Sequence, residues 1–491
     1  MSIDYSNSNT IFNPPENLID GYELVVGLEV HAELATATKV FCSCPNQFGD
    51  EPNTNICPVC LGLPGSLPVL NHQVVELAIR LGLALNCSVH SSVFHRKNYF
   101  YPDMPKDYQV TQYDQPIDRE GYLDLPSGKR IGIERAHLEE DTGKSTHIGG
   151  GGGRIHGSEY SLVDYNRAGI PLLEIVGKPD IRTSEEAKHY MAELQEILIA
   201  TGVSDAKMEE GSMRCDANVS VHKPGTTFGT RCEIKNLNSL RSLGRAIEYE
   251  ARRQIQMVEA GEKIRQETRH WSDVDSRTHT LRVKENADDY RYFLEPDLVP
   301  VVPGEVWIDA VRQALPVLPA ARRSLVADVI EMTITDETVI VLVQRGWDGL
   351  LFDCIAAGAD PIRTAIHLQH NCPPDGPTPT PATMAELTAL ELNGKLTATQ
   401  AKTVMADIVA AGGDADPAAL AAARGFEAMD TGVLAAAVDA AIAAQPDAWA
   451  KYVAGEDKAM GALVGAIMRT TKGQADGKAV TAMLQQRRSA A

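Results

Sequence analysis

The chain is organised around the stretch Tyr22-Glu23-Leu24-Val25-Val26-Gly27-Leu28-Glu29-Val30-His31-Ala32-Glu33-Leu34. Read with a period of two, it places Glu29, His31 and Glu33 on one face and apolar side chains on the other. This alternation predicts a half-buried strand. Its polar face either meets water or offers oxygen and nitrogen ligands to a divalent cation, and the stretch alone favours the solvated face.

Composition bounds the class of protein. The chain has 491 residues, of which 44% are hydrophobic and 23% are charged, as in an ordinary soluble globular protein of several domains. No apolar run reaches the roughly eighteen residues of a membrane span. Residues 1–20 are polar and lack the features of a signal peptide, which predicts a disordered lead-in to a cytoplasmic protein. The net charge of −20 argues against a nucleic-acid partner globally, but a local basic patch could still bind one.

Four of the nine cysteines lie close together, directly after the opening strand. Cys42 and Cys44 form one close pair, and Cys57 and Cys60 form a second. Two such pairs are typical of a four-cysteine zinc knuckle, in which four thiolates close a tetrahedron. Because four protein ligands leave no open position, the expected role of the zinc is structural. Four unrelated buried thiols are the less favoured alternative.

Further stretches combine acids with basic and amide side chains on strand-like segments. They are residues 131–145, 208–220 and 231–236. Several polar-faced strands of this kind predict a charged cavity lined by a curved sheet, where ATP, a metal and a carboxylate could meet. Gly143-Lys144-Ser145 resembles the end of a P-loop, but Leu138 stands where that motif requires its first glycine, so the motif is excluded.

The rest of the chain is mainly helical. Thr183 and Glu186 predict a helix N-terminus with a capping box, and Gly202 predicts its end. After about Pro303 the strand signals stop and alanine becomes frequent. The expected fold class is α+β: a curved, antiparallel-rich sheet forming a catalytic cradle with packed helices, then an all-α domain and a small helical tail. The expected boundaries are 1–20, 21–308, 309–425 and 426–491.

With these stretches identified, the chain closely resembles the GatB family, whose members work within bacterial aspartyl/glutamyl-tRNA(Asn/Gln) amidotransferases. The segments that carry the resemblance are GLEVHAEL at 27–34, RKNYFYPDMPKDYQ at 96–109, HLEEDTGKSTH at 137–147, EGSMRCDANVS at 210–220, EIKNLNS at 233–239, VKENADDYRYF at 283–293 and GALVGAIMRTTKGQAD at 461–476. The resemblance runs from about residue 20 to the end and is weakest between about 310 and 445.

The resemblance implies a ligase of protein biosynthesis that works as a heterotrimer without a membrane. An amidase-type GatA subunit releases ammonia from glutamine, and a small GatC subunit wraps the other two. The GatB subunit uses ATP and Mg²⁺ to phosphorylate the side-chain carboxylate of Glu or Asp mischarged on tRNA(Gln) or tRNA(Asn). Ammonia then displaces phosphate. The chain carries no Gly-Ser-Ser-Gly amidase signature, which agrees with this division of labour.

The resemblance also implies site residues. The expected magnesium ligands are Glu29, His31 and Glu140, and the further catalytic acids are Glu139, Glu210 and Asp216. The expected ATP and phosphate contacts are Lys144, Arg214 and Asn218, and Lys97 is expected to border the ammonia entry. The basic tail is expected to bind tRNA through Lys458, Arg469, Lys472 and Lys478, although a solvated helix face predicts that charge almost as well.

Two other functions compete with this one. A non-catalytic scaffold could hold tRNA through the zinc knuckle and the basic tail while a partner does the chemistry. The acids at Glu29, Glu140 and Glu210 argue against it, because a scaffold for a polyanion gains nothing from a negative cavity. A self-sufficient metal-dependent hydrolase would need a nucleophile and turnover without partners.

Overall fold

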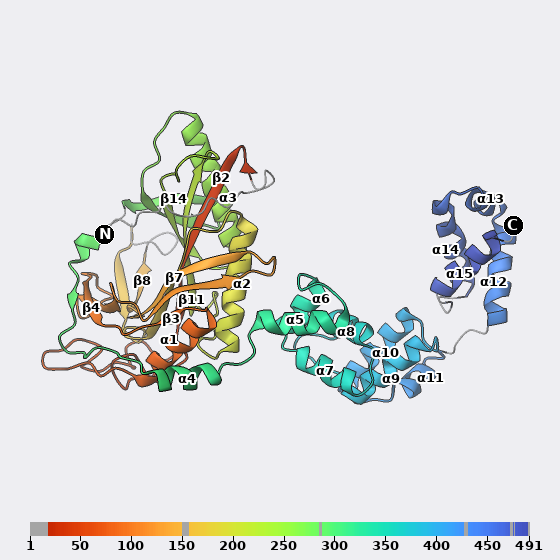
Figure 1. Ribbon diagram of the computed structural model, residues 1–491, viewed down its shortest axis with the longest axis horizontal. Coiled ribbons are helices and arrows are strands. Elements are labelled where there is room, and N and C mark those ends of the chain that lie inside the picture. The colour runs from red at the N-terminus through yellow and green to blue at the C-terminus, as the bar shows by residue number, and fades with distance from the viewer. Residues whose placement is uncertain are drawn as a thin grey trace. The chain divides into compact units, whose positions relative to one another are not determined.

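The computed structural model describes residues 18–149, 157–283, 287–426, 431–471, 475 and 477–489. The chain divides into two compact units, residues 1–320 and 321–491. Figure 1 shows the sheet with its helices in the first unit and helices alone in the second. Of the predicted lead-in, only residues 18–20 lie within the described part.

Within the described residues, the first unit is built on a thirteen-stranded sheet with β2 (Tyr22–Glu33) inside it. β2 pairs with β10 (Pro171–Gly177) on one side and with β11 (Met213–His222) on the other, and both pairs are antiparallel. The order is β14-β13-β12-β11-β2-β10-β7-β5-β4-β15, and of the neighbours along this path only β12 and β13 run parallel. The predicted antiparallel-rich sheet is therefore confirmed.

The remaining strands of this sheet are short, apart from β7. They are β1 (Leu18–Ile19), β3 (Ser88–Val89), β4 (Phe94–Asn98), β5 (Tyr108–Gln112), β6 (Asp118–Asp124), β7 (Arg130–Glu140), β12 (Cys232–Leu237), β13 (Glu267–Ser272), β14 (Arg277–Val283) and β15 (Phe293–Leu294). A separate two-stranded sheet consists of β8 (Lys144–Ile148) and β9 (Tyr160–Asp164).

Three helices supply the hydrophobic core of this unit: α1 (His72–Ala84), α2 (Ser184–Ala200) and α3 (Leu240–Glu259). Their buried side chains share one cluster with the apolar face of β2. Each large aliphatic side chain buried there contributes about 1.5–3 kcal/mol. The helix predicted after Thr183 is confirmed as α2, and the Thr183 side chain accepts a hydrogen bond from the Glu186 backbone N–H at 3.0 Å.

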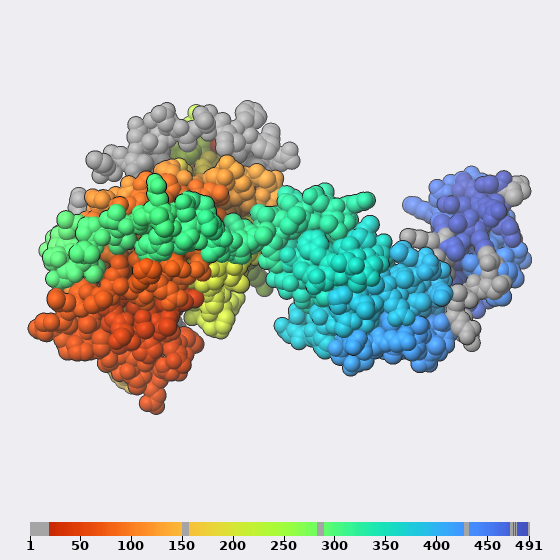
Figure 2. Space-filling model, turned by 60° about the horizontal axis from the view of Figure 1, so that its bottom comes forward, coloured from red at the N-terminus to blue at the C-terminus, as the bar shows by residue number. Residues whose placement is uncertain are grey.

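Helix α4 (Glu305–Gln313) also belongs to the first unit. Trp307 packs against the core and stacks on His72 of α1, with ring centroids 4.4 Å apart. In Figures 1 and 2 the green segment that contains α4 runs over the outside of the red and orange N-terminal part. The first unit therefore extends to Ala320, beyond the expected boundary at residue 308.

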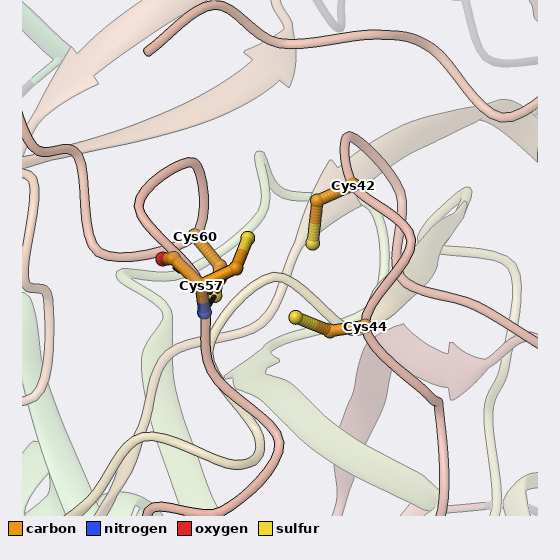
Figure 3. Close-up of side chains that lie close together, drawn as sticks. All are labelled: Cys42, Cys44, Cys57 and Cys60. Carbon is orange, nitrogen blue, oxygen red and sulfur yellow. Dashed lines mark hydrogen bonds between the residues drawn. The ribbon is translucent and has the colours of Figure 1, made fainter.

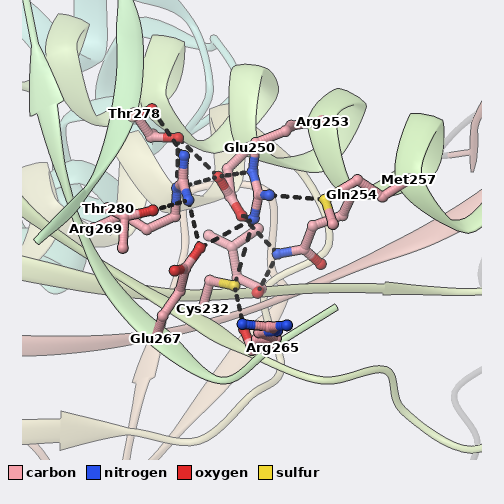
Figure 4. A network of polar contacts seen from close by, with 11 residues as sticks. Cys232, Glu250, Arg253, Gln254, Met257, Arg265, Glu267, Arg269, Thr278 and Thr280 are labelled. Carbon is pink, nitrogen blue, oxygen red and sulfur yellow. Dashed lines mark hydrogen bonds and ion pairs between the residues drawn. The ribbon is translucent and has the colours of Figure 1, made fainter. Parts of the chain in front are cut away.

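A buried ion-pair network ties α3 to the β13–β14 edge of the sheet (Figure 4). Glu250 is fully buried and accepts hydrogen bonds from Arg253 Nη2 at 2.6 Å and from Thr278 Oγ1 at 2.9 Å. Arg269 Nε lies 3.4 Å from the same carboxylate. Glu267 also pairs with Arg269 and lies 4.0 Å from Arg253 Nη2. Two carboxylates thus compensate two guanidinium groups, and loss of Glu250 would leave an excess of positive charge in the network.

We expect Glu250→Gln to lower the free energy of unfolding of the first unit by about 1–3 kcal/mol, because Arg253 and Arg269 lose one of the two carboxylates that they share. Hydrogen exchange of β13 and β14 amides across a urea series measures this loss. Glu262→Gln is the matched control, because Glu262 is exposed in the loop after α3 and should change stability by less than about 0.5 kcal/mol. A loss below about 1 kcal/mol for Glu250→Gln would contradict the network's role.

The second unit is helical, with two hydrophobic cores among its described residues. The first core is formed by α5 (Pro319–Ile330), α6 (Glu337–Gln344), α7 (Asp348–Ala356), α8 (Pro361–Asn371), α9 (Pro381–Leu392), α10 (Ala398–Ala410) and α11 (Pro417–Ala423). The second is formed by α12 (Thr431–Ala444), α13 (Pro446–Val453), α14 (Met460–Thr470) and α15 (Gly477–Ser489). Proline at the first helical position and a capping Asp or Thr start α8, α9 and α11.

None of the helices in the described ranges combines the length and the apolar character needed to cross a membrane.

Candidate active site

A cavity of about 570 Å³ opens on the charged face of β2 and its neighbours. Six carboxylates and four basic side chains line it, together with polar and aromatic groups. These charged residues are Glu29, His31, Lys97, Glu139, Asp141, Glu174, Arg214, Asp216, Glu233 and Lys235. The volume is typical of a small-molecule site, and the excess of acids suits a bound cation.

Strand pairing brings four ionisable side chains into one row across the sheet. Glu174 on β10 lies opposite His31 on β2, and His31 lies opposite Arg214 on β11. His137 on β7 pairs with Glu174 from the other side. Residues paired directly across antiparallel strands share a face, so the four side chains leave the same side of the sheet.

His31, Glu139 and Glu174 form a candidate metal site. One ligand atom from each lies within 4.8 Å of the other two. His31 Nε2 is 3.2 Å from Glu174 Oε2 and 3.6 Å from Glu139 Oε1. Two carboxylates and an imidazole at this spacing could hold a divalent cation, and carboxylates are the protein ligands that Mg²⁺ and Mn²⁺ favour.

The protonation of this cluster follows from burial and from its own charges. Burial lowers the pKa of His31, but the hydrogen bond and the charge of Glu174 outweigh it and raise that pKa to about 9. Burial and the nearby Glu174 charge raise the pKa of Glu139 to about 7. Although burial disfavours the Glu174 carboxylate, His137 and His31 hold its pKa well below the usual range. Glu174 is therefore the ionised acid that anchors the cluster.

Glu29 and Asp216 lie opposite each other in the neighbouring row of β2 and β11. Asn218 Nδ2 donates a hydrogen bond to Glu29 Oε1 at 2.8 Å, which orients the carboxylate. Asp216 is bonded to Lys235 of β12. Asn218 thus positions the Glu29 carboxylate, and it is not among the residues that line the cavity.

The basic side chains of the cavity differ in their partners. Arg214 Nη2 is 2.7 Å from Asp141 Oδ2, and Lys235 Nζ is 3.2 Å from Glu233 Oε1. Lys97 Nζ instead lies 4.7 Å from the centroid of the Tyr290 ring. Burial lowers the pKa of Lys97, but Tyr292, Glu139 and Glu174 together raise it above its ordinary value. All three cations are therefore charged at neutral pH.

The four cysteines of the predicted knuckle converge (Figure 3). Cys42 and Cys44 come from one loop, Cys57 and Cys60 come from the next, and the four sulfur atoms lie within 4.8 Å of one another. The Cys57 backbone N–H donates to Cys60 Sγ at 3.1 Å, which holds this pair in a tight turn. This set could hold a metal such as zinc.

Comparison with known proteins places the chain in a family. The profile of the GatB/GatE catalytic domain matches residues 24–309, and that of the GatB domain matches residues 369–487. The chain belongs to the GatB family. It is 49% identical to the B subunit of the aspartyl/glutamyl-tRNA(Asn/Gln) amidotransferase from Salinispora arenicola, over 96% of this chain and 97% of the relative.

Relatives of the same name from Thermobifida fusca and Corynebacterium diphtheriae are 49% and 47% identical, over 95% and 96% of this chain and 94% and 97% of their own lengths. The resemblance seen in the sequence is thus confirmed, and the chain is a subunit of a glutamine-dependent amidotransferase, a ligase. Of the residues predicted for its site, the GatB-family cavity brings together Glu29, His31, Lys97, Glu139, Arg214 and Asp216.

Glu140, a predicted magnesium ligand, does not line the cavity that Glu29 and His31 line. Its buried side chain is bonded to Lys106 and accepts the Val110 backbone N–H at 2.8 Å. It lines a different, smaller cavity beside Cys42 and Cys60. Adjacent residues of a strand point to opposite faces, so Glu139 can occupy the main cavity only if Glu140 turns away from it.

Glu210, a predicted catalytic acid, and Lys144, a predicted phosphate contact, also lie outside the main cavity. Both line a second cavity, of about 560 Å³, whose wall includes Arg167, the ion-pair partner of Asp141. Glu210 sits in an exposed turn and pairs with Lys207 at 3.0 Å. Lys144 is exposed on β8, which belongs to the separate two-stranded sheet, so the main sheet does not carry it into the cavity.

Glu174 was missed from sequence. Asp141 and Lys235 lie in stretches that were predicted to line the cavity but were given no role of their own, and the same holds for His137, which lies behind Glu174. Glu174 is the single charged residue in the apolar strand β10, and a lone acid in such a strand is the signal that could have found it. Lys235 follows Glu233 with strand spacing, which places both on one face.

The predicted tRNA contacts in the tail are only partly described. Lys458 and Arg469 are exposed, on the turn before α14 and on α14 itself. Lys472 lies outside the described residues, as does the side chain of Lys478. Arg487 pairs with Asp439 at 2.8 Å and Arg488 with Asp457 at 2.8 Å, so part of the basic charge is neutralised within the tail.

Proposed function

We propose that this protein activates the side-chain carboxylate of glutamate or aspartate carried by a mischarged tRNA(Gln) or tRNA(Asn). The observation that carries the proposal is the placement of the metal-binding set His31, Glu139 and Glu174 in the same cavity as Arg214 and Lys235. Phosphoryl transfer depends mainly on positioning and on neutralising negative charge, and this cavity offers groups for both.

The chemistry needs two balanced steps. A carboxylate oxygen of the aminoacyl group attacks the terminal phosphorus of ATP, the bond from that phosphorus to the bridging oxygen breaks, and ADP leaves with the electron pair. Ammonia then attacks the carbonyl carbon of the acyl phosphate, inorganic phosphate leaves, and the nitrogen loses a proton to give the amide. The ammonia comes from glutamine hydrolysed by a partner amidase subunit, with a small third subunit completing the complex.

The residues have distinct roles in this proposal. A Mg²⁺ ion held by His31, Glu139 and Glu174 would supply Lewis-acid neutralisation of phosphate charge. Arg214 on β11 and Lys235 on β12 supply positive charge on the other side of β2. Each is kept in place by its carboxylate partner. Glu29, oriented by Asn218, adds a second acidic position. The cysteine cluster would bind zinc as a structural ion, and the helical tail would contact tRNA through Lys458 and Arg469.

The test is tRNA-dependent ATP hydrolysis by the assembled complex with its partner subunits. We expect His31→Ala to lower this rate at least ~100-fold, because it removes a metal ligand from the cavity, while tRNA affinity stays unchanged. His90→Ala is the matched control, since His90 is exposed, its ring is hydrogen-bonded to Ser88, and it does not line the cavity. Loss of tRNA binding with ATP hydrolysis intact would favour a scaffold instead.

A further inference from the structure

Within the part of the chain that the structure describes, Lys97 differs from the other cations of the cavity in having no carboxylate partner. Arg214 is paired with Asp141, Lys235 with Asp216 and Glu233. Among the described residues, no carboxylate lies within ion-pair distance of Lys97 Nζ. A cation committed to a carboxylate must give up that bond to take a ligand anion, whereas Lys97 can accept one directly.

Arg96, the neighbour of Lys97 on the same strand, does have a carboxylate partner, so within the described ranges the lack of one is specific to the cation that faces the cavity. Arg96 and Lys97 are consecutive on β4 and therefore face opposite sides. Arg96 forms a bidentate pair with Glu295, at 2.7 and 2.8 Å. Lys97, turned to the cavity, is partly buried and meets the ring of Tyr290. Within the described residues, Arg96, which points away from the cavity, thus has a carboxylate partner, and Lys97, which points into the cavity, has none.

The position of Lys97 Nζ is fixed by its surroundings. Lys97 pairs across the strands with Gln109 of β5, whose side chain also lines the cavity. The Tyr290 ring, with its centroid 4.7 Å away, gives a cation–π contact that holds the ammonium group over the cavity. Lys97 lines the same cavity as His31, Glu139 and Glu174, the metal-binding set. An anion bound to a cation at that set would therefore come within reach of Lys97.

We propose that Lys97 contacts the terminal phosphate of the bound nucleotide and follows its oxygens during transfer to the carboxylate. This inference rests on the proposed function. This role differs from one at the ammonia entry. The charged ammonium group of Lys97 attracts an anion such as phosphate, but it has no comparable electrostatic attraction for neutral ammonia. A phosphate between the metal set and Lys97 would be neutralised from two sides, which is what a phosphoryl group in transfer requires.

The experiment compares variants in the assembled complex. For Lys97→Met we expect kcat for tRNA-dependent ATP hydrolysis to fall about 100-fold, as when one preorganised charge-stabilising group is removed. Lys97→Arg should recover at least about tenfold of this loss, because it keeps the positive charge. Lys178→Met is the matched control and should keep the wild-type rate, since Lys178 is bonded to Glu120 away from the cavity.

A binding measurement separates a phosphate contact from a structural role. By calorimetry, Lys97→Met should weaken the binding of a non-hydrolysable ATP analogue about tenfold and that of ADP by less than about threefold, because ADP lacks the contacted phosphate. If the methionine variant does not fold, Lys97→Gln is measured in the same way. Equal losses for both nucleotides, or a kcat within about threefold of wild type, would overturn the inference. A wild-type complex without tRNA-dependent ATP hydrolysis would overturn the proposed function instead.

Discussion

Glu174→Gln is expected to lower metal-dependent ATP turnover by the assembled complex at least ~100-fold. Glu174 is the ionised acid of the cluster, and its Oε2 lies 3.2 Å from His31 Nε2. The substitution replaces one of the two carboxylates that could hold the cation with a neutral amide. The same change should lower the pKa of His31 from about 9, because Glu174 is the main group that raises it. Steady-state kinetics and an NMR titration of His31 measure the two effects.

Glu140→Gln is the matched comparison for this prediction. Glu140 is also a buried acid of the same sheet, but it faces Lys106 and the smaller cavity. We expect its replacement to leave Mn²⁺ affinity, measured by calorimetry, within about threefold of wild type, while Glu174→Gln weakens it by about 10–100-fold. The reverse order of effects would mean that Glu140 completes the metal set and that the arrangement described above is wrong.

Cys60→Ser is expected to remove zinc from the chain and to lower the free energy of unfolding of the first unit by at least ~3 kcal/mol. The physical reason is that the four sulfur atoms hold two loops together through the metal, and three ligands hold it far less tightly. Elemental analysis of the purified chain should give about one zinc ion for wild type and little for the variant. Urea unfolding measures the accompanying loss of stability.

The control for the zinc prediction is Cys87→Ser. Cys87 is buried in the same unit but belongs to the hydrophobic core, far along the chain from the four clustered cysteines. Its replacement should keep the full zinc content. A wild-type chain purified without any bound metal would rule out the zinc site, and a Cys60→Ser variant with unchanged zinc would exclude Cys60 as a ligand.

Much of the fold could be predicted from local patterns. The alternation in Tyr22–Glu33 predicted β2, and Thr183 predicted the start of α2. The spacing of the four cysteines predicted their convergence, because two close pairs each form a turn on their own. In sequence, α4 resembles another surface helix, and only the packing of Trp307 on the first core shows that the compact unit continues to Ala320.

The site was predicted less completely, and β7 shows why. Ile131 and Ile133 of β7 lie in the core, so strict alternation would turn Glu139 to the core and Glu140 to the cavity. The pairing of β7 with β10 shifts at one point: Val176 pairs with Arg135, but Gly177 pairs with Ile133. The extra residue on β7 reverses the alternation, as a β-bulge does, and brings Glu139 into the cavity.

The sequence by itself determined the family, the strand that carries Glu29 and His31, and the four cysteines, because each depends on residues close together in the chain. Only the tertiary structure decided which acids meet His31. Glu174 reaches it through pairing of β10 with β2, and Glu139 through a register shift in β7. Register is set by packing between distant segments, and one residue of slip turns every side chain to the opposite face.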